Sequence, residues 1–180
     1  MSGTSYYDYV ARHVFAPARM TASGSEPEDS TIAGRSVGYT MQGPGGPAAA
    51  ARPNTGTLPW RGTAAGGGYS TVRDLARFAE ALRAHRLLDA RHTALPRTGK
   101  VNAGGGRYAY GFQERNAGEL RMVGHGGGAP GMNGELFIEP QSGTVVAVLA
   151  NMGPPAASRV ATFIVNRVSA RAPATGTLTP

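Results

Sequence analysis

Apolar residues recur at helical spacing in three segments of the chain. The pattern predicts helices over residues 5–15, 71–84 and 154–170. Capping boxes mark the first two starts, made by Ser5 with Asp8 and by Thr71 with Asp74. Pro17 is expected to end the first helix near Phe15, because proline removes a helical hydrogen bond. The last helix is expected to face the core with Val160, Phe163, Ile164 and Val168.

Short apolar runs predict strands in the second half of the chain. They lie at residues 107–112, 120–123, 135–138 and 144–149. The last two flank a turn at Pro140–Gly143 and are expected to form an antiparallel hairpin. Residues 144–149 are almost continuously apolar, which predicts a central strand covered on both faces. The order of elements predicts an α+β fold, with an antiparallel sheet from residues 107–150 and the 154–170 helix across one face.

Residues 21–57 show little periodicity and are expected to form a surface excursion. Gly43–Pro47 and the alanines at 48–51 are of low complexity, which favours a flexible, lid-like or disordered insertion. We expect residues 1–170 to belong to one folded portion and residues 171–180 to be a disordered tail.

Composition excludes several classes of function. The chain has 180 residues, a net charge of +7 and no cysteine, so thiolate metal sites and cysteine nucleophiles are absent. No apolar run reaches the ~18–20 residues of a membrane span, and no signal peptide is visible, which leaves the compartment open. Of 18 basic residues 17 are arginines scattered along the chain, without a basic, aromatic patch, so no nucleic-acid partner is expected.

One candidate for catalysis is a serine triad. Gly34–Gly38 fits the G-x-S-x-G nucleophile elbow around Ser36, and Asp89 and His125 follow in the order of an α/β-hydrolase esterase. The elbow requires a strand before the serine and a helix after it, and residues 31–33 are short for such a strand. This esterase is the alternative enzyme that the sequence offers.

The segment His125–Gly131 is the stronger candidate. Glycine is unfavourable in a strand unless a backbone or a ligand must approach closely. A glycine-lined strand beside a histidine can offer backbone N–H groups to a developing oxyanion. A glycine-rich hairpin loop is the structural alternative. The four histidines lack metal-ligand spacing, so neither a metal ion nor another cofactor is expected.

Four segments, in order, resemble the serine β-lactamase and penicillin-binding-protein-like hydrolases, which include class C β-lactamases, esterases and D-aminopeptidases. They are Gly3–Val10 running to Met20, Arg35–Tyr39, Ala64–Thr71 with Asp74-Leu75, and Tyr110-Gly111-Phe112 followed by Gly124–Gly127 and Pro130-Gly131. The resemblance spans about residues 3–152. It implies part of a β-lactamase/DD-peptidase-like fold and acyl transfer on β-lactam, ester or peptide substrates.

The resemblance also implies roles for one short segment. The family's third active-site motif is Lys or His, any residue, then Gly, which His125-Gly126-Gly127 matches. His125 is then the electrostatic and hydrogen-bonding member of the site, and Gly128 offers one oxyanion N–H. Gly126 and Ala129 are expected to line the substrate.

The family's nucleophile motif is not found in these residues. Lys100 is the only lysine and Arg97 precedes it by three, so Ser-x-x-Lys is absent; Tyr-x-Asn is absent too. We therefore expect a C-terminal half, with the N-terminal half missing, that is inactive alone. Its expected partners are the substrate and either the missing half or further copies of itself. A non-catalytic binding domain is the third hypothesis.

Overall fold

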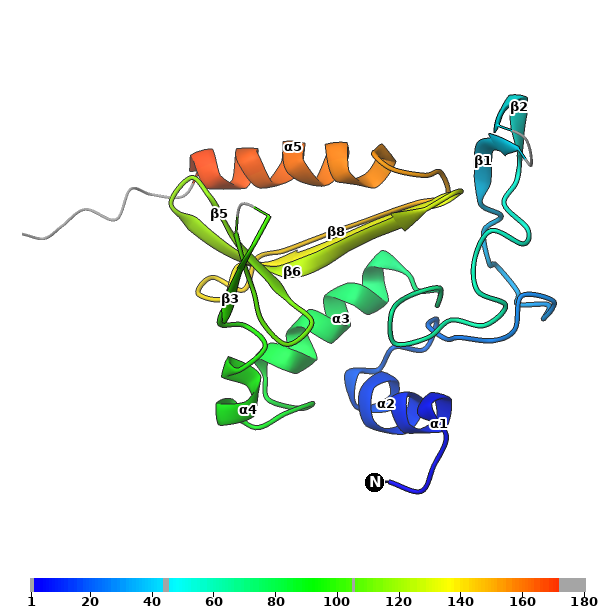
Figure 1. The fold of residues 1–180 in the computed structure, drawn as a ribbon. Helices are drawn as coiled ribbons and strands as arrows, with labels where there is room; N and C mark the ends of the chain where they lie inside the picture. The colour runs from blue at the N-terminus through cyan, green and yellow to red at the C-terminus, as the bar shows by residue number, and fades with distance from the viewer. Residues whose placement is uncertain (1, 44–45, 105, 172–180) are drawn as a thin grey trace, which may run out of the picture.

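The computed structural model describes residues 2–43, 46–104 and 106–171, and its centre is a six-stranded sheet (Figure 1). Each strand pairs antiparallel with the next along the chain. The strands are β3 Val101–Ala103, β4 Gly106–Tyr108, β5 Gln113–Ala117, β6 Leu120–Ala129, β7 Met132–Ile138 and β8 Val145–Ala150. The predicted α+β fold and the hairpin of residues 135–149 are therefore confirmed.

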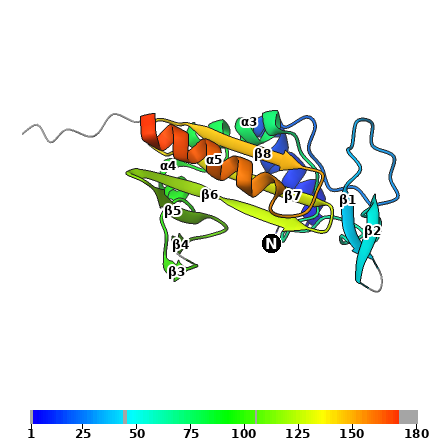
Figure 2. The ribbon, with the colours of Figure 1, turned by 90° about the horizontal axis from the view of Figure 1, so that it is seen from above.

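One long helix covers each face of the sheet (Figures 1 and 2). Helix α5, Ala156–Arg171, packs against one face, where its Ala161 and Val165 meet buried side chains of β6, β7 and β8. Helix α3, Val72–Arg83, lies under the opposite face, where Ala79 packs against a second buried group. The alternation of strand side chains divides the sheet residues between these two cores.

The orientation of α5 differs from the prediction. Its most buried side chains include Ala157 and Ala161, with no exposed surface, whereas Val160 is 48% exposed and Phe163 is 56% exposed. The small alanine side chains let the helix lie close to the sheet, and this turns the larger apolar residues Val160 and Phe163 outward. Ile164 packs at the edge of the core, as expected.

The N-terminal helix is longer than predicted. Ser5 caps α1, Tyr6–Val10, which continues as a π-helix, Ala11–Phe15, and then as α2, Ala16–Ala18. The N–H of Ala16 bonds the carbonyl of Ala11, so the helix is already widened ahead of Pro17. The proline ring is accommodated there rather than ending the helix at Phe15.

Residues 107–112 do not form the single strand that was predicted. Strand β4 ends at Tyr108, and the chain reverses between Ala109 and Phe112, whose backbone groups hydrogen-bond at 2.8 Å. Gly111 supports this turn with a left-handed φ of 80°. Strand β5, which the sequence pattern did not reveal, follows directly.

Strand β8 lies at an edge of the described sheet, so the prediction of a central strand was wrong. It pairs with β7 only, and along it Val146 is buried, Leu149 is exposed and the other residues are half-buried. Its apolar run is nevertheless covered on both faces, as predicted, because Val146 belongs to the core under α5 and Val145 packs against the core over α3.

The excursion contains regular structure that was not predicted. Strands β1, Tyr39–Gly43, and β2, Gly46–Pro53, form a separate antiparallel hairpin, although Pro44 and Gly45 lie outside the described residues.

A short helix, α4, Ala90–Ala94, follows α3. Of the expected tail, Arg171 ends α5 and residues 172–180 lie outside the described part. No helix within the described ranges has the length and apolarity to cross a bilayer.

Candidate active site

The glycine segment is a strand rather than a hairpin loop. Strand β6 continues through Ala129 and pairs with β7 over its whole glycine run. Strand β5 pairs with β6 only as far as Gln113 opposite Gly124. Within the described residues, His125–Ala129 therefore has a ladder partner on one side and a free edge on the other.

Alternation along β6 divides its residues between the two faces of the sheet. Met122 belongs to the core under α5, and Val123 to the core over α3. With a period of two, His125 and Gly127 point to the α3 face. Histidine and its motif glycine thus share one face, beside the free edge.

The glycines of β6 differ in what surrounds them. A Cβ at Gly124 would overlap the backbone of Leu136, and one at Gly128 would overlap the ring of Pro154. At Gly127 a Cβ would meet nothing within 4 Å. Packing within the described chain explains the first two glycines, whereas Gly127 borders open space.

His125 is exposed, and both of its ring nitrogens have partners. Nδ1 lies 2.5 Å from the carbonyl oxygen of Gly126, and Nε2 lies 3.1 Å from the hydroxyl of Tyr108 in β4. The two rings meet edge to face, with centroids 5.7 Å apart. Sequence reasoning missed Tyr108, which lies only two residues before the Tyr110-Gly111-Phe112 segment that carried part of the resemblance.

The buried side chain of Asn133, in β7, connects the glycine strand to α5. Its Nδ2 donates to the carbonyl of Gly127 at 2.8 Å, and its Oδ1 accepts from the backbone N–H groups of Ala157 (2.8 Å) and Ser158 (3.1 Å). The amide thereby satisfies N–H groups at the start of α5. This contact holds the strand around Gly127 against a long helix, and no sequence pattern pointed to it.

The remaining predicted site residues are Gly126, Gly128 and Ala129. Gly128 pairs with Asn133 and is exposed, and Ala129, next to the turn, pairs with Met132 and is half-buried. Gly126 pairs with Glu135, whose carboxylate fills the space beside it. The strand therefore gathers all five predicted residues along one edge, where backbone groups lie beside His125.

The excursion is anchored at the end of this strand. Asn54 Nδ2 and Thr57 Oγ1 both donate to the carbonyl of Pro130, each at 3.1 Å. Gly131 has a φ of 82°, and a side chain there would overlap Asn54. Residues 54–57 thus fix the turn that follows Ala129.

The structure does not assemble the alternative triad. Ser36 lies in an exposed loop with neither a strand directly before it nor a helix after it, so the nucleophile elbow is not formed. Asp89 caps α4 and bonds His92 instead of His125. The hydrogen bonds of His125 go to Tyr108 and Gly126.

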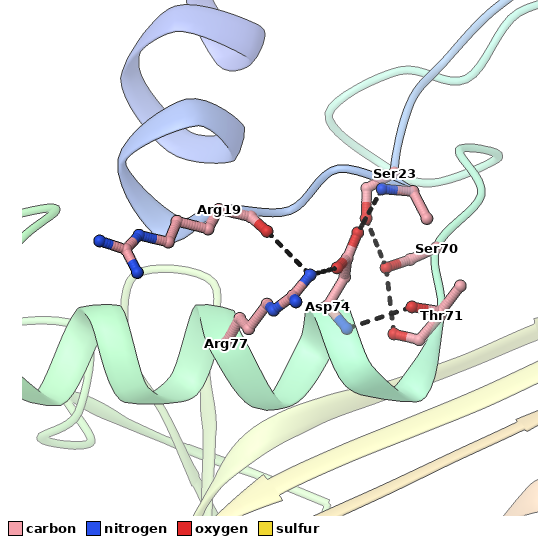
Figure 3. A network of polar contacts seen from close by, with 7 residues as sticks. Arg19, Ser23, Ser70, Thr71, Asp74 and Arg77 are labelled. Atoms are coloured by element: carbon pink, nitrogen blue, oxygen red, sulfur yellow. Dashed lines mark hydrogen bonds and ion pairs between the residues drawn. The ribbon is translucent and has the colours of Figure 1, made fainter.

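A second polar network lies at the start of α3 (Figure 3). Buried Asp74 accepts from the N–H of Ala22 at 2.7 Å, from Ser23 Oγ at 2.9 Å and from Arg77 at 3.0 Å. Burial alone would raise the pKa of Asp74, but these hydrogen bonds outweigh it and hold the pKa below its ordinary value. The network attaches the segment after α2 to α3 and contains none of the predicted site residues.

Comparison with known proteins places this geometry in a family. The profile of the Beta-lactamase family matches residues 1–170. A penicillin binding protein from Bacillus halodurans is 27% identical, with a TM-score of 0.79, and the match covers 93% of this chain and 50% of that chain. No curated protein sequence matches the chain.

Two further solved structures share the fold. The octameric penicillin-binding protein homologue from Pyrococcus abyssi is 24% identical (TM-score 0.76; 93% of this chain, 38% of that chain). The D-amino acid amidase from Ochrobactrum anthropi SV3 is 21% identical (TM-score 0.74; 94% of this chain, 53% of that chain). The chain thus spans about half the length, or less, of these proteins. Because the family profile covers all but the last ten residues, the chain belongs to the Beta-lactamase family of serine β-lactamase and penicillin-binding-protein-like hydrolases.

Proposed function

We propose that this chain supplies the third-motif strand of a serine hydrolase that acts by acyl transfer on β-lactam, ester or peptide-like amide substrates. The observation that carries the proposal is the arrangement of β6, where exposed His125 and open Gly127 share one face beside a free strand edge. A substrate that lies along this edge meets backbone groups and the histidine together.

The proposed roles follow from the chemistry of acyl transfer. Attack on a carbonyl creates an oxyanion, which N–H groups fixed in advance stabilise more strongly than mobile water does. Gly128 would provide one such N–H, while Gly126 and Ala129 would align the substrate through their backbone. His125 would supply hydrogen bonding and electrostatic stabilisation beside the reacting group, and the space above Gly127 would admit the substrate.

The nucleophile would come from outside these 180 residues. A serine hydroxyl is a weak nucleophile until a neighbouring base takes its proton, which in this family is the task of Ser-x-x-Lys. No such motif and no Tyr-x-Asn occur here. We therefore expect the 180-residue chain alone to be inactive.

The solved structures suggest substrates to try. One neighbour is a D-amino acid amidase crystallised with L-phenylalanine amide, and another is a D-stereospecific amidohydrolase from Streptomyces sp.. A panel of nitrocefin, a p-nitrophenyl ester and D-phenylalanine amide covers the three substrate classes.

Turnover and covalent labelling test the proposal. The chain alone should show neither turnover of the panel nor labelling by a penicillin or fluorophosphonate probe. The coding sequence upstream of Met1 should encode Ser-x-x-Lys and Tyr-x-Asn in frame, and the protein that includes them should be labelled at that serine. In that protein His125→Ala should lower turnover. Labelling at Ser36 in the chain alone, or an upstream protein without labelling, would contradict the proposal, and the latter would favour a binding domain.

Self-association is a second part of the proposal. Strand β8 has a free edge in the described sheet, and α5 turns Val160 and Phe163 outward. The Pyrococcus abyssi homologue is described as octameric. Unpaired edges and exposed apolar side chains both favour association, either with another segment or with a second copy.

A further inference from the structure

Tyr108 and His125 meet across three strands of the sheet. Tyr108 pairs with Gln113 of β5, and Gln113 pairs with Gly124 of β6. His125 is one residue further along β6, beyond the last pair with β5. The phenol therefore reaches the free edge just past the start of β5, where its hydroxyl meets His125 Nε2 at 3.1 Å.

The backbone of Tyr108 is held on both sides, which makes this approach reproducible. Besides its pairing with β5, Tyr108 lies opposite Val101 of β3, and its carbonyl accepts from the N–H of Lys100 at 2.7 Å. The side chain thus starts from a fixed position in the sheet, although it ends at an exposed histidine.

The partners of the imidazole define which nitrogen carries the proton. A backbone carbonyl only accepts hydrogen bonds, so Nδ1, which faces Gly126 O at 2.5 Å, must carry a hydrogen. In the neutral ring Nε2 then has a lone pair and no hydrogen. The Tyr108 O–H is the donor to it.

We infer that the Gly126 carbonyl fixes His125 as the Nδ1–H tautomer, and that Tyr108 is a positioning residue whose O–H supports this tautomer and holds Nε2 at the free edge of β6. The meaning of this arrangement for acyl transfer rests on the proposed function. There the pair would present one basic nitrogen and one hydroxyl at fixed positions beside the space over Gly127. The tautomer of His125 can be measured in a protein that has no enzymatic activity.

Nitrogen NMR of the 180-residue chain tests the inference directly. Long-range ¹H–¹⁵N spectra at about pH 8.5, well above the ordinary histidine pKa of about 6.5, show which ring nitrogen is protonated. We expect His125 to be protonated at Nδ1 and not at Nε2, with its signals assigned through His125→Gln. His92 serves as an internal reference, because its Nδ1 lies 2.8 Å from the Asp89 carboxylate, which also only accepts.

Tyr108→Phe removes the hydroxyl and keeps the ring. Without a donor to Nε2 the Nε2–H form of His125 should become populated and shift both ring signals, while His92 stays unchanged. Tyr110→Phe is the matched control, since Tyr110 is 69% exposed and its variant should leave the His125 signals as they are. A wild-type His125 protonated at Nε2, or a folded Tyr108→Phe spectrum identical to wild type, would overturn the inference. The wild-type spectrum decides the tautomer even if the variant does not fold.

Discussion

The carboxylate of Glu135 occupies the space that any side chain at Gly126 would need. The two residues are direct cross-strand partners in β6 and β7, and a Cβ on Gly126 would overlap both carboxylate oxygens. Glu135 is held there by Ser158 Oγ, which donates to Oε1 at 2.8 Å, and by Arg115, whose Nη2 lies 3.6 Å from Oε2. Gly126, the middle residue of the motif, is therefore kept free of a side chain by the buried carboxylate of Glu135 on the α5 face of the sheet.

Gly126→Ala should lower the free energy of unfolding by about 1–3 kcal/mol, the usual cost of overfilling a packed site. In a Glu135→Ala background the same substitution should cost much less, because the obstructing carboxylate is gone. Urea unfolding of the four proteins of this double-mutant cycle measures the coupling. Additive effects would show that the carboxylate does not enforce the glycine.

Gly127→Ala should behave in the opposite way. Its Cβ meets no atom within 4 Å and its φ lies outside the left-handed region, so the fold should be unchanged or more stable by up to about 1 kcal/mol. Gly124→Ala is the control in the same strand, because its Cβ would overlap the backbone of Leu136. In urea unfolding, the Gly127→Ala protein should therefore have a clearly larger free energy of unfolding than the Gly124→Ala protein. Equal losses of unfolding free energy in the two variants would mean that the space over Gly127 is closed.

The buried Asp74 of α3 should contribute more to stability than Asp8, the aspartate in the same position of α1. Asp74→Ala leaves Ala22 N–H without its partner and also frees Arg77, for an expected loss of about 2–4 kcal/mol. Asp8, the equivalent residue three after Ser5, is exposed, and Asp8→Ala should cost less than about 1 kcal/mol. Thermal and urea unfolding compare the two, and equal losses would leave Asp74 as a helix-capping residue only.

Local signals in the sequence predicted the elements that depend on neighbouring residues. The Thr71 cap and the apolar stripe that follows it define α3, and the two apolar runs around Pro140–Gly143 define β7 and β8. Each of these signals lies within a few residues of the element that it describes. Helix α5 was found for the same reason, but its orientation was not, because alanines rather than Phe163 face the sheet.

The candidate site was predicted only in part, because its contacts depend on the register between strands. His125 and its glycines were found from their composition and from the family resemblance. Tyr108 reaches His125 only because β4, β5 and β6 pair in one particular register, and Asn133 depends on where α5 begins. Neither dependence leaves a periodic pattern in the sequence.

Glu114 should make the stability of the chain depend on pH in acid. It accepts from Arg121 Nε at 3.0 Å and from the N–H of Gly99 at 2.6 Å, and these contacts lower the pKa of Glu114 to about 2. A carboxyl whose pKa is lower in the folded state stabilises the fold above its unfolded pKa, and this contribution disappears as the pH falls through its folded pKa. For Glu114 the loss should therefore run from about pH 4.5 down to about pH 2.

Glu114→Gln should remove that contribution, on the order of 2 kcal/mol at pH 7 after allowance for solvent screening. The difference from wild type should shrink toward zero near pH 2, as measured by urea unfolding across the pH range. Glu119→Gln, at an exposed turn next to β6, is the control and should follow the wild-type curve. A Glu114→Gln deficit that is constant with pH would assign the loss to packing instead of charge.

The outer face of α5 should make the 180-residue chain prone to association. Val160 and Phe163 are exposed on one helix, above a sheet whose last strand, β8, has a free edge. Exposed apolar side chains and unpaired strand edges favour contacts with other chains. We expect ANS binding and a molecular mass that rises with concentration in light scattering, together with a broad thermal transition.

The double substitution Val160→Ser and Phe163→Ser should reduce both ANS binding and association, because it removes apolar surface without touching the buried side of α5. Leu88→Ser is the matched control, since Leu88 is also an exposed apolar residue but lies away from α5, and it should change neither measurement. A partner that binds the folded state and not the unfolded state raises the free energy of unfolding. Any partner that covers α5 should therefore also sharpen the thermal transition. A wild-type chain that stays monomeric, binds no ANS and unfolds in one sharp transition would contradict this expectation, because these exposed side chains would then need no cover.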